Sequence, residues 1–256
     1  MLAEADFATM SLKKMYAHCG GAILVNRNSK VLSEQQIEAM GVTIKRQTTT
    51  DYGNGYRSYS GLMGDGMVEI IAGLVCAVDE EIVGKRIAQC GMVSCYLKDR
   101  YDFPIIHGGH AIYVAADQVL PNVPLANCPA EYLNAIFMRS LQIRGCGLGY
   151  LVYGQRTTVK DAGEEGENVI FKNKLNMDSL RLAVPRCEYT NEEMIAFLSI
   201  IGEAYAEGKF QDLKGGLTPV NYVDNGFYHF GGKYAFHDEA EFTKISSVLR
   251  ESADQV

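Results

Sequence analysis

The clearest pattern of apolar and polar positions lies between residues 190 and 208 and predicts an amphipathic helix. Apolar side chains recur there at helical spacing and form one stripe, at Met194, Ile195, Leu198, Ile201 and Tyr205. Thr190 stands three residues before Glu193, which is the spacing of a capping box at a helix start. Gly208 follows the stripe and is a natural C-terminal stop.

Two further capping spacings predict helix starts at Ser33 and at Asp238, each three residues before a Gln or Glu. The remaining helices are expected at residues 4–17, 65–78, 79–99 and 129–143. The most apolar stretch of the chain, Ile70–Val78, falls within the second of these. It is far shorter than the roughly 20 residues needed to span a bilayer. We therefore interpret this stretch as a buried helix.

Strand-like segments alternate irregularly with these helices. They are expected at residues 22–26, 41–47, 105–116, 150–160, 169–173 and 179–184, with a hairpin formed by 227–230 and 234–236 around two glycines. Because helices and strands do not alternate strictly, the order favours an α+β fold over a doubly wound parallel sheet. We predict one domain over residues 1–256, with a mixed or mainly antiparallel sheet and about six helices.

The composition indicates an acidic globular protein with reduced thiols. The chain has 256 residues, 47% of them hydrophobic, and a net charge of −7, which argues against a general phosphate-binding surface. Its seven cysteines have no framework spacing, and acids stand where a signal peptide needs basic residues. These features predict a soluble cytoplasmic protein without a membrane segment.

A cluster of thiols and imidazoles between residues 90 and 110 is the first candidate for chemistry. Cys90, Cys95, His107 and His110 have the spacing C-x4-C-x11-H-x2-H, and zinc takes thiolate and imidazole ligands together. The same residues would suit a cysteine nucleophile with a histidine base. The alternative is that the cysteines are small core residues. Zinc is the cofactor that this pattern predicts.

A glycine-rich loop from Asp51 to Gly66 is the second candidate, because backbone amides at a helix start can cradle an anion. Basic and small residues would complete a site for a phosphate or an RNA backbone: Lys45, Arg46, Arg57, Ser60, Gly61 and Gly64. The alternative is an ordinary glycine-rich connection.

Two other motifs favour packing. The run Gly145-Cys146-Gly147-Leu148-Gly149 lacks the spacing of a dinucleotide fingerprint, and we interpret it as close backbone packing. The aromatic C-terminal cluster includes Tyr228, Phe230 and Tyr234, which are predicted either as core or as a partner surface.

One resemblance agrees with the anion-binding loop. Ile23-Leu24-Val25-Asn26, then Lys45-Arg46, Tyr56-Arg57 and Ser60-Gly61 ahead of a helix, resemble the opening of the RNA-binding backbone subunit of archaeal-type CRISPR effector complexes. The resemblance covers about fifty residues. It implies a ferredoxin-like core that polymerises along a guide RNA.

Three functions follow from these patterns. The first is a non-catalytic subunit that forms a homo-oligomer or a larger assembly through protein or RNA contacts, because no complete catalytic constellation stands out. The second is an intracellular enzyme, such as a zinc-dependent hydrolase, with its Cys/His site near residues 90–110. The third is the CRISPR-type RNA-binding subunit.

Overall fold

The computed structural model describes residues 4–14, 16–17, 20–47, 49–51, 57–59, 64–149, 152, 154–159, 168–173, 178–185, 188–219 and 234–255. Contacts divide the chain into two compact units, Met1–Lys85 and Arg86–Val256. The boundary falls inside a helix, at a place where no composition change marks the sequence. Within the described residues, no helix combines the length and apolar character that a membrane crossing requires.

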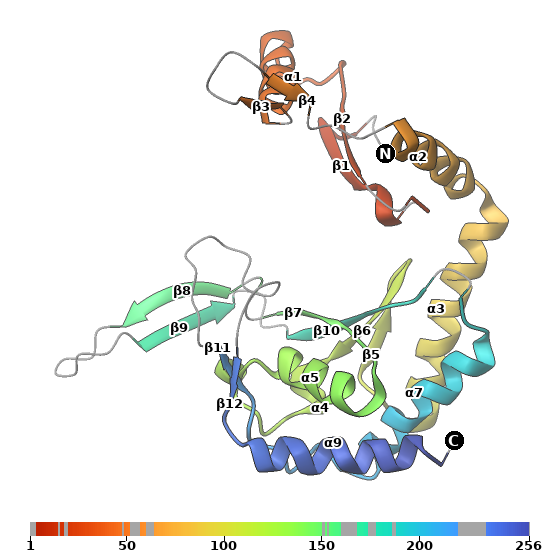
Figure 1. Ribbon diagram of the computed structural model, residues 1–256, viewed down its shortest axis with the longest axis vertical. Coiled ribbons are helices and arrows are strands. Elements are labelled where there is room, and N and C mark those ends of the chain that lie inside the picture. The colour runs from red at the N-terminus through yellow and green to blue at the C-terminus, as the bar shows by residue number, and fades with distance from the viewer. Residues whose placement is uncertain are drawn as a thin grey trace. The chain divides into compact units, whose positions relative to one another are not determined.

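The described part of the first unit contains the hairpins β1–β2 and β3–β4 and the helices α1 and α2 (Figure 1). Its elements are β1 (Phe7–Ser11), the 3-10 helix η1 (Leu12–Lys14), β2 (Gly21–Val25), α1 (Glu34–Gln47), β3 (Thr49–Asp51), β4 (Arg57–Tyr59) and α2 (Gly64–Ala77). β1 pairs with β2 and β3 pairs with β4, both antiparallel. The unit also includes the first turn of α3 (Glu80–Tyr101).

Two predictions in this unit are wrong. Residues 4–17 form β1 and η1 rather than a helix, because exposed and half-buried side chains alternate from Phe7 to Ser11 with the period of a strand. Residues 41–47 continue α1 rather than forming a strand. The Ser33 cap is confirmed: Gln36 N donates to Ser33 Oγ, and Ser33 N donates to Gln36 Oε1.

The helix predicted at 65–78 is confirmed as α2, but it is not buried. Gly73 is its only residue with little exposure among those described, while Met67, Val68, Ile71 and Val75 are exposed. Apolar residues at this density normally enter a core. The local sequence therefore predicts the helix correctly, whereas its burial depends on what packs against it.

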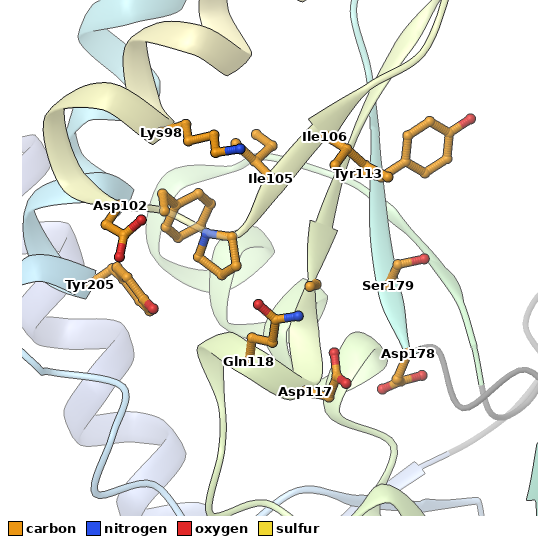
Figure 2. A pocket seen from close by; sticks show the side chains of 13 residues that line it. Lys98, Asp102, Ile105, Ile106, Tyr113, Asp117, Gln118, Asp178, Ser179 and Tyr205 are labelled. Atoms are coloured by element: carbon orange, nitrogen blue, oxygen red, sulfur yellow. The ribbon is translucent and has the colours of Figure 1, made fainter.

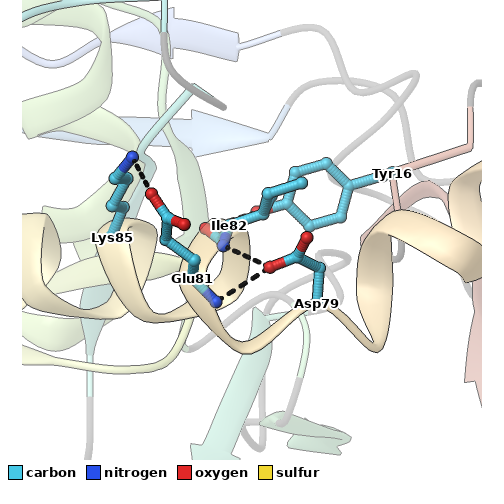
Figure 3. Close-up of polar contacts among 5 residues, drawn as sticks. All are labelled: Tyr16, Asp79, Glu81, Ile82 and Lys85. Atoms are coloured by element: carbon cyan, nitrogen blue, oxygen red, sulfur yellow. Dashed lines mark hydrogen bonds and ion pairs between the residues drawn. The ribbon is translucent and has the colours of Figure 1, made fainter.

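The start of α3 is held by side chains from its own unit (Figure 3). Asp79 Oδ1 accepts hydrogen bonds from Glu81 N at 2.9 Å and Ile82 N at 3.2 Å, so Asp79 caps the helix. Tyr16 donates its hydroxyl proton to the Ile82 carbonyl at 3.2 Å, and Lys85 pairs with Glu81 at 2.7 Å.

The second unit is built around a four-stranded sheet with strand order β5-β6-β10-β7. After α3 its elements are β5 (Ile105–His107), β6 (Ala111–Ala115), α4 (Ala116–Val119), η2 (Leu125–Asn127), α5 (Pro129–Leu141), β7 (Cys146–Leu148), β8 (Gly154–Val159), β9 (Asn168–Asn173), β10 (Ser179–Ala183), α7 (Asn191–Ala206), β11 (Leu217–Pro219), β12 (Tyr234–Phe236) and α9 (Glu239–Ala253). Every described strand pair is antiparallel, which confirms the α+β class with antiparallel sheets.

One face of this sheet carries the core. Leu180 of β10 lies opposite Val114 of β6, and Leu182 lies opposite Ile112. These side chains are buried, and α4 and α5 pack on this side of the sheet (Figure 1). Cys90, Val93 and Leu97 of α3 join the same cluster. The alternation along β10 leaves Ser179, Arg181 and Ala183 on the opposite face.

The predicted caps of α7 and α9 are confirmed. Thr190 and Glu193 form a complete capping box. Asp238 accepts from Glu241 N at 2.8 Å, but the Glu241 carboxylate accepts instead from Gly215 N and Lys214 N. α7 packs closely against α3, because a Cβ at Gly202 would collide with the Tyr101 ring.

One strand prediction needs adjustment, one falls partly outside the described residues, and one strand was not predicted. The segment 105–116 is a hairpin, β5 and β6, rather than one strand. β12 pairs with β11, and residues 227–230, predicted as its hairpin partner, lie outside the described residues. β7 was not predicted as a strand because Gly147 at its centre and the glycines on either side of it carry no β-propensity signal.

Candidate functional site

A row of polar and polarisable side chains crosses the open face of the sheet. Arg181 on the central strand β10 lies directly opposite Tyr113 of β6 on one side and Cys146 of β7 on the other. All three are half-buried. Within the described part of the chain, the Arg181 guanidinium makes no hydrogen bond or ion pair. A guanidinium held on a rigid strand without a carboxylate partner is suited to receive an anion in bidentate fashion.

The pKa of the Cys146 thiol reflects the burial and the charges around this row. Burial raises its pKa, the Arg181 guanidinium lowers it, Glu131 raises it and Arg144 lowers it. Burial dominates, so the thiol is more protonated than a free cysteine. The raised pKa disfavours the thiolate that a nucleophile needs, although the Arg181 guanidinium beside Cys146 partly offsets the effect of burial.

Two carboxyl groups lie beneath the same sheet, at the N-terminus of α5. Asp178 is 1% exposed, and its Oδ2 accepts from Ala130 N at 2.7 Å. The N-cap residue Cys128 makes no side-chain cap bond, so Asp178 caps α5 from the start of β10.

Glu131 is the second of these carboxyl groups, and it is 8% exposed. Neither of its oxygens has a hydrogen-bond partner among the described residues. Burial, followed by the negative charge of Asp178, raises the pKa of Glu131 to about 8. Glu131 is therefore mostly protonated at neutral pH, which reduces the cost of burying it unpaired.

The glycines at 145, 147 and 149 make this arrangement fit. A Cβ at Gly145 would collide with Leu180, one at Gly147 with the Glu131 carboxyl group, and one at Gly149 with the Asp178 carboxylate. The interpretation of the motif as close backbone packing is confirmed. Its function is to let β7 pass directly over the two acids.

A cavity of about 700 Å³ opens beside the row (Figure 2). Tyr113 and Ser179 line it from the open face of the sheet, and Lys98 and Asp102 line it from the end of α3. Asp117 and Asp178 lie across the cavity from Lys98 and Asp102, with Asp178 next to Ser179 (Figure 2). Its lining combines apolar walls with charges of both signs, as small-molecule sites do.

The four residues predicted to bind zinc do not form a metal site. Cys90 is fully buried in the core and Cys95 is exposed on the same helix, while His107 is exposed on β5 and His110 lies in the turn before β6. Among the described residues, no group of three or more His, Cys, Asp or Glu could hold a metal ion. Residues five apart on a helix point in different directions, so the spacing could not bring the cysteines together.

The predicted anion-binding residues are described only in part. Lys45 and Arg46 belong to the last turn of α1, and Arg57 belongs to β4. The structure does not describe where their side chains lie. Ser60 and Gly61 lie outside the described residues, and Gly64 is the exposed first residue of α2. Anion binding by this loop stays a prediction.

The predicted aromatic surface is also described in part. Tyr228 and Phe230 lie outside the described residues, whereas Tyr234 on β12 is half-buried and packs against the core cluster. A partner-binding role for the three stays a prediction.

Sequence reasoning missed Arg181, Glu131 and Asp178. One signal was present: in the alternating strand Ser179–Ala183, an arginine between two leucines must face away from the core. The two acids gave no such signal, because their burial depends on the contact between β7 and α5.

Comparison with known proteins finds enzymes. The chain is 32% identical over 157 residues to a probable tryptophanase of Aeropyrum pernix, covering 60% of this chain and 31% of that protein. It is 29% identical over 210 residues to a tryptophanase of Hyphomonas neptunium, covering 80% and 40%. It is 27% identical over 228 residues to a tyrosine phenol-lyase of Fusobacterium nucleatum, covering 87% and 43%. No protein-family model matches the chain.

These similarities correct the predicted function. The chain spans about 31–43% of the length of these relatives, and they carry the names of catalytic lyases. The prediction of a non-catalytic assembly subunit is therefore wrong, as are the zinc-dependent hydrolase and the CRISPR-type RNA-binding subunit. The predicted zinc cofactor is wrong for the same reason and because the described residues form no metal site.

Proposed function

We propose that this chain forms part of a pyridoxal-phosphate-dependent lyase that eliminates the β-substituent of an aromatic amino acid. The observation that carries the proposal is the similarity to tryptophanases and a tyrosine phenol-lyase over 80–87% of this chain. Because the chain spans 40–43% of the length of those two proteins, the activity belongs to the completed enzyme.

The cofactor, when bound, supplies an electron sink that stabilises the carbanion formed at the amino acid's α-carbon. A lysine of this chain would hold it covalently through the side-chain amine. Lys14 in η1 donates from Nζ to Ser11 Oγ at 3.2 Å, so a neutral hydroxyl orients its amine. Lys85 and Lys209, in contrast, are paired with Glu81 and Glu207. We assign the attachment role to Lys14.

Arg181 is assigned the role of binding the substrate's carboxylate. Its guanidinium is fixed on the central strand, flanked by Tyr113 and Cys146, and it has no carboxylate partner among the described residues. A planar guanidinium binds a carboxylate through two parallel hydrogen bonds and so fixes the orientation of an amino acid. Tyr113 beside it offers a hydroxyl and an aromatic face.

We further propose that the completed enzyme is a homo-oligomer. Support comes from the tryptophanase-type relatives, which are typically oligomers. Light scattering on the completed enzyme would give an integral multiple of its subunit mass, and a monomer at all concentrations would contradict this part of the proposal.

Covalent trapping of the cofactor tests the proposed function. The full chain is incubated with pyridoxal phosphate, reduced with borohydride and mapped by peptide mass spectrometry. The expected label is on Lys14, lost in Lys14→Ala and kept in the neighbouring control Lys13→Ala. Labelling spread evenly over surface lysines, or unchanged in Lys14→Ala, would reject the assignment.

A further inference from the structure

The first unit almost lacks a core of its own. Among the described residues of Met1–Lys85, only Leu12 and Ala17 are buried hydrophobic side chains, whereas the second unit contains the rest of the core. The sheets that the structure describes in this unit, β1–β2 and β3–β4, have two strands each. Isolated two-stranded sheets are marginally stable in water, and a unit of this size needs more buried apolar surface to stay folded.

Among the described residues of this unit, most of the exposed large apolar side chains lie on α2 or directly after it. Six side chains on α2 and the residue after it are 38–80% exposed: Met67, Val68, Ile71, Leu74, Val75 and Val78. At 100° per residue they fall in one stripe about 120° wide, which is the width of a core-facing helix surface. Gly73, on another side of α2, is buried. We call these six residues the α2 stripe.

The β1–β2 hairpin exposes a second apolar surface. Thr9 lies directly opposite Ile23 and Phe7 opposite Val25, so these four residues share one face of the hairpin. Phe7 is 53% and Ile23 is 48% exposed. Neither outer edge of the hairpin pairs with another strand in the described part of the chain.

We infer that the first unit docks, through the α2 stripe and the exposed β1–β2 face, onto the polypeptide that corresponds to the rest of the lyase. The inference rests on the proposed function. The two relatives matched over most of this chain are more than twice as long as the matched region, so a complete lyase contains much polypeptide that this chain does not span. A contiguous exposed apolar stripe such as the one on α2 marks a protein interface.

A binding experiment with a defined probe tests this inference. The probe is the part of the Hyphomonas neptunium tryptophanase outside the region matched by this chain, produced as a separate polypeptide. The full chain is titrated with it, and the dissociation constant is measured for wild type, Val68→Glu, Val75→Glu and the control Val31→Glu. Val31 is 74% exposed in the same unit but is not part of the α2 stripe. Circular dichroism checks that the variants keep their helix content.

The expected result is a one-to-one complex that each stripe variant weakens roughly tenfold or more, because burying a glutamate in an apolar contact is costly. Val31→Glu should bind like wild type. No complex, or equal weakening by all three variants, would overturn the inference.

Two further outcomes would also overturn it. Unfolding of a monomeric free chain at a lower urea concentration in Val68→Glu and Val75→Glu, but not in Val31→Glu, would show that the chain alone already buries the stripe. A dimer of the free chain, dissociated by the stripe variants, would show that a second copy covers it.

Lyase activity of the complex is measured separately, as indole released from tryptophan in the presence of pyridoxal phosphate. A complex that depends on the α2 stripe but releases neither indole from tryptophan nor phenol from tyrosine would reject the proposed function and leave the docking surface standing. Indole release that Val68→Glu and Val75→Glu leave unchanged would reject the docking surface and leave the proposed function standing.

Discussion

The carboxyl group of Glu131 lies directly against the α-carbon of Gly147, across the contact between α5 and β7. No side chain larger than hydrogen fits at position 147 while Glu131 keeps its place. This contact joins the helix that Asp178 caps to the strand that carries Cys146 beside Arg181. The packing beneath the sheet therefore positions the row on its open face.

Replacing Gly147 with alanine tests this contact. We expect Gly147→Ala to lower the free energy of unfolding by about 1–3 kcal/mol, because the added methyl group forces Glu131 out of its place. The control is Gly84→Ala in α3, where nothing lies within 4 Å of the added atom. That change should raise stability by about 0.5–1 kcal/mol through helix propensity. Urea titrations of both variants give the comparison, and equal effects would contradict the close packing.

The stability of the second unit should depend on the ionisation of Glu131. Its pKa is raised from 4.5 to about 8 in the folded protein, so the folded state holds this proton more tightly than the unfolded state. The stabilisation that this tighter proton binding gives the folded state is fully present below about pH 4.5. It falls as the pH rises and is lost above about pH 8. The size should be on the order of a few kcal/mol.

Glu131→Gln removes this titration and should flatten the pH profile of the unfolding midpoint between pH 5 and 8 (about the range set by the two pKa values). The matched control is Glu251→Gln, an exposed glutamate on α9. If wild type and Glu131→Gln have parallel profiles, Glu131 does not titrate in this range.

Asp178 should influence both the cap and the neighbouring acid. In Asp178→Asn the amide oxygen still accepts from Ala130 N, but the negative charge that raises the pKa of Glu131 is gone. We expect the pH profile to shift to lower pH, with α5 intact. Asp178→Ala also removes the cap and should cost about 0.5–2 kcal/mol more. The same denaturation series measures both, and an unshifted profile in Asp178→Asn would show that the two acids are uncoupled.

The effect of the Arg181 charge can be measured through the reactivity of the Cys146 thiol in this chain alone. Arg181 lowers the pKa of this thiol against the larger effect of burial. Arg181→Gln should therefore slow alkylation of Cys146 by iodoacetamide roughly two- to tenfold, because less thiolate is present. Arg181→Lys should preserve most of the rate. The exposed thiol of Cys95 is the internal reference, and a parallel slowing at Cys95 would point to a general effect instead.

Much of the secondary structure could be predicted from local sequence. The caps at Ser33, Thr190 and Asp238 are short-range hydrogen-bond patterns, and all three mark true helix starts. The segments that failed depended on more distant context. Residues 4–17 contain the apolar density of a helix, but the chain turns at Leu12 and pairs back on itself at Gly21–Val25.

The site was less predictable, because its parts are brought together by the sheet. Tyr113, Cys146 and Arg181 lie far apart in the sequence and meet only through the register of β6, β10 and β7. A zinc or catalytic site was predicted instead from the spacing of Cys90, Cys95, His107 and His110. However, α3 buries one of these cysteines and exposes the other. The α2 stripe was expected inside a core, and the apolar pattern alone does not say which polypeptide supplies that core.

The most direct test of the central claim is the release of indole or phenol by the completed enzyme. The full chain is mixed with the complementing part of the Hyphomonas neptunium tryptophanase and pyridoxal phosphate, and tryptophan or tyrosine is added. The account predicts product with the wild-type chain, none with Lys14→Ala, and a strongly raised KM with Arg181→Gln, while Lys13→Ala remains active. A complex that forms but releases neither product, or that stays active with Lys14→Ala, would contradict it.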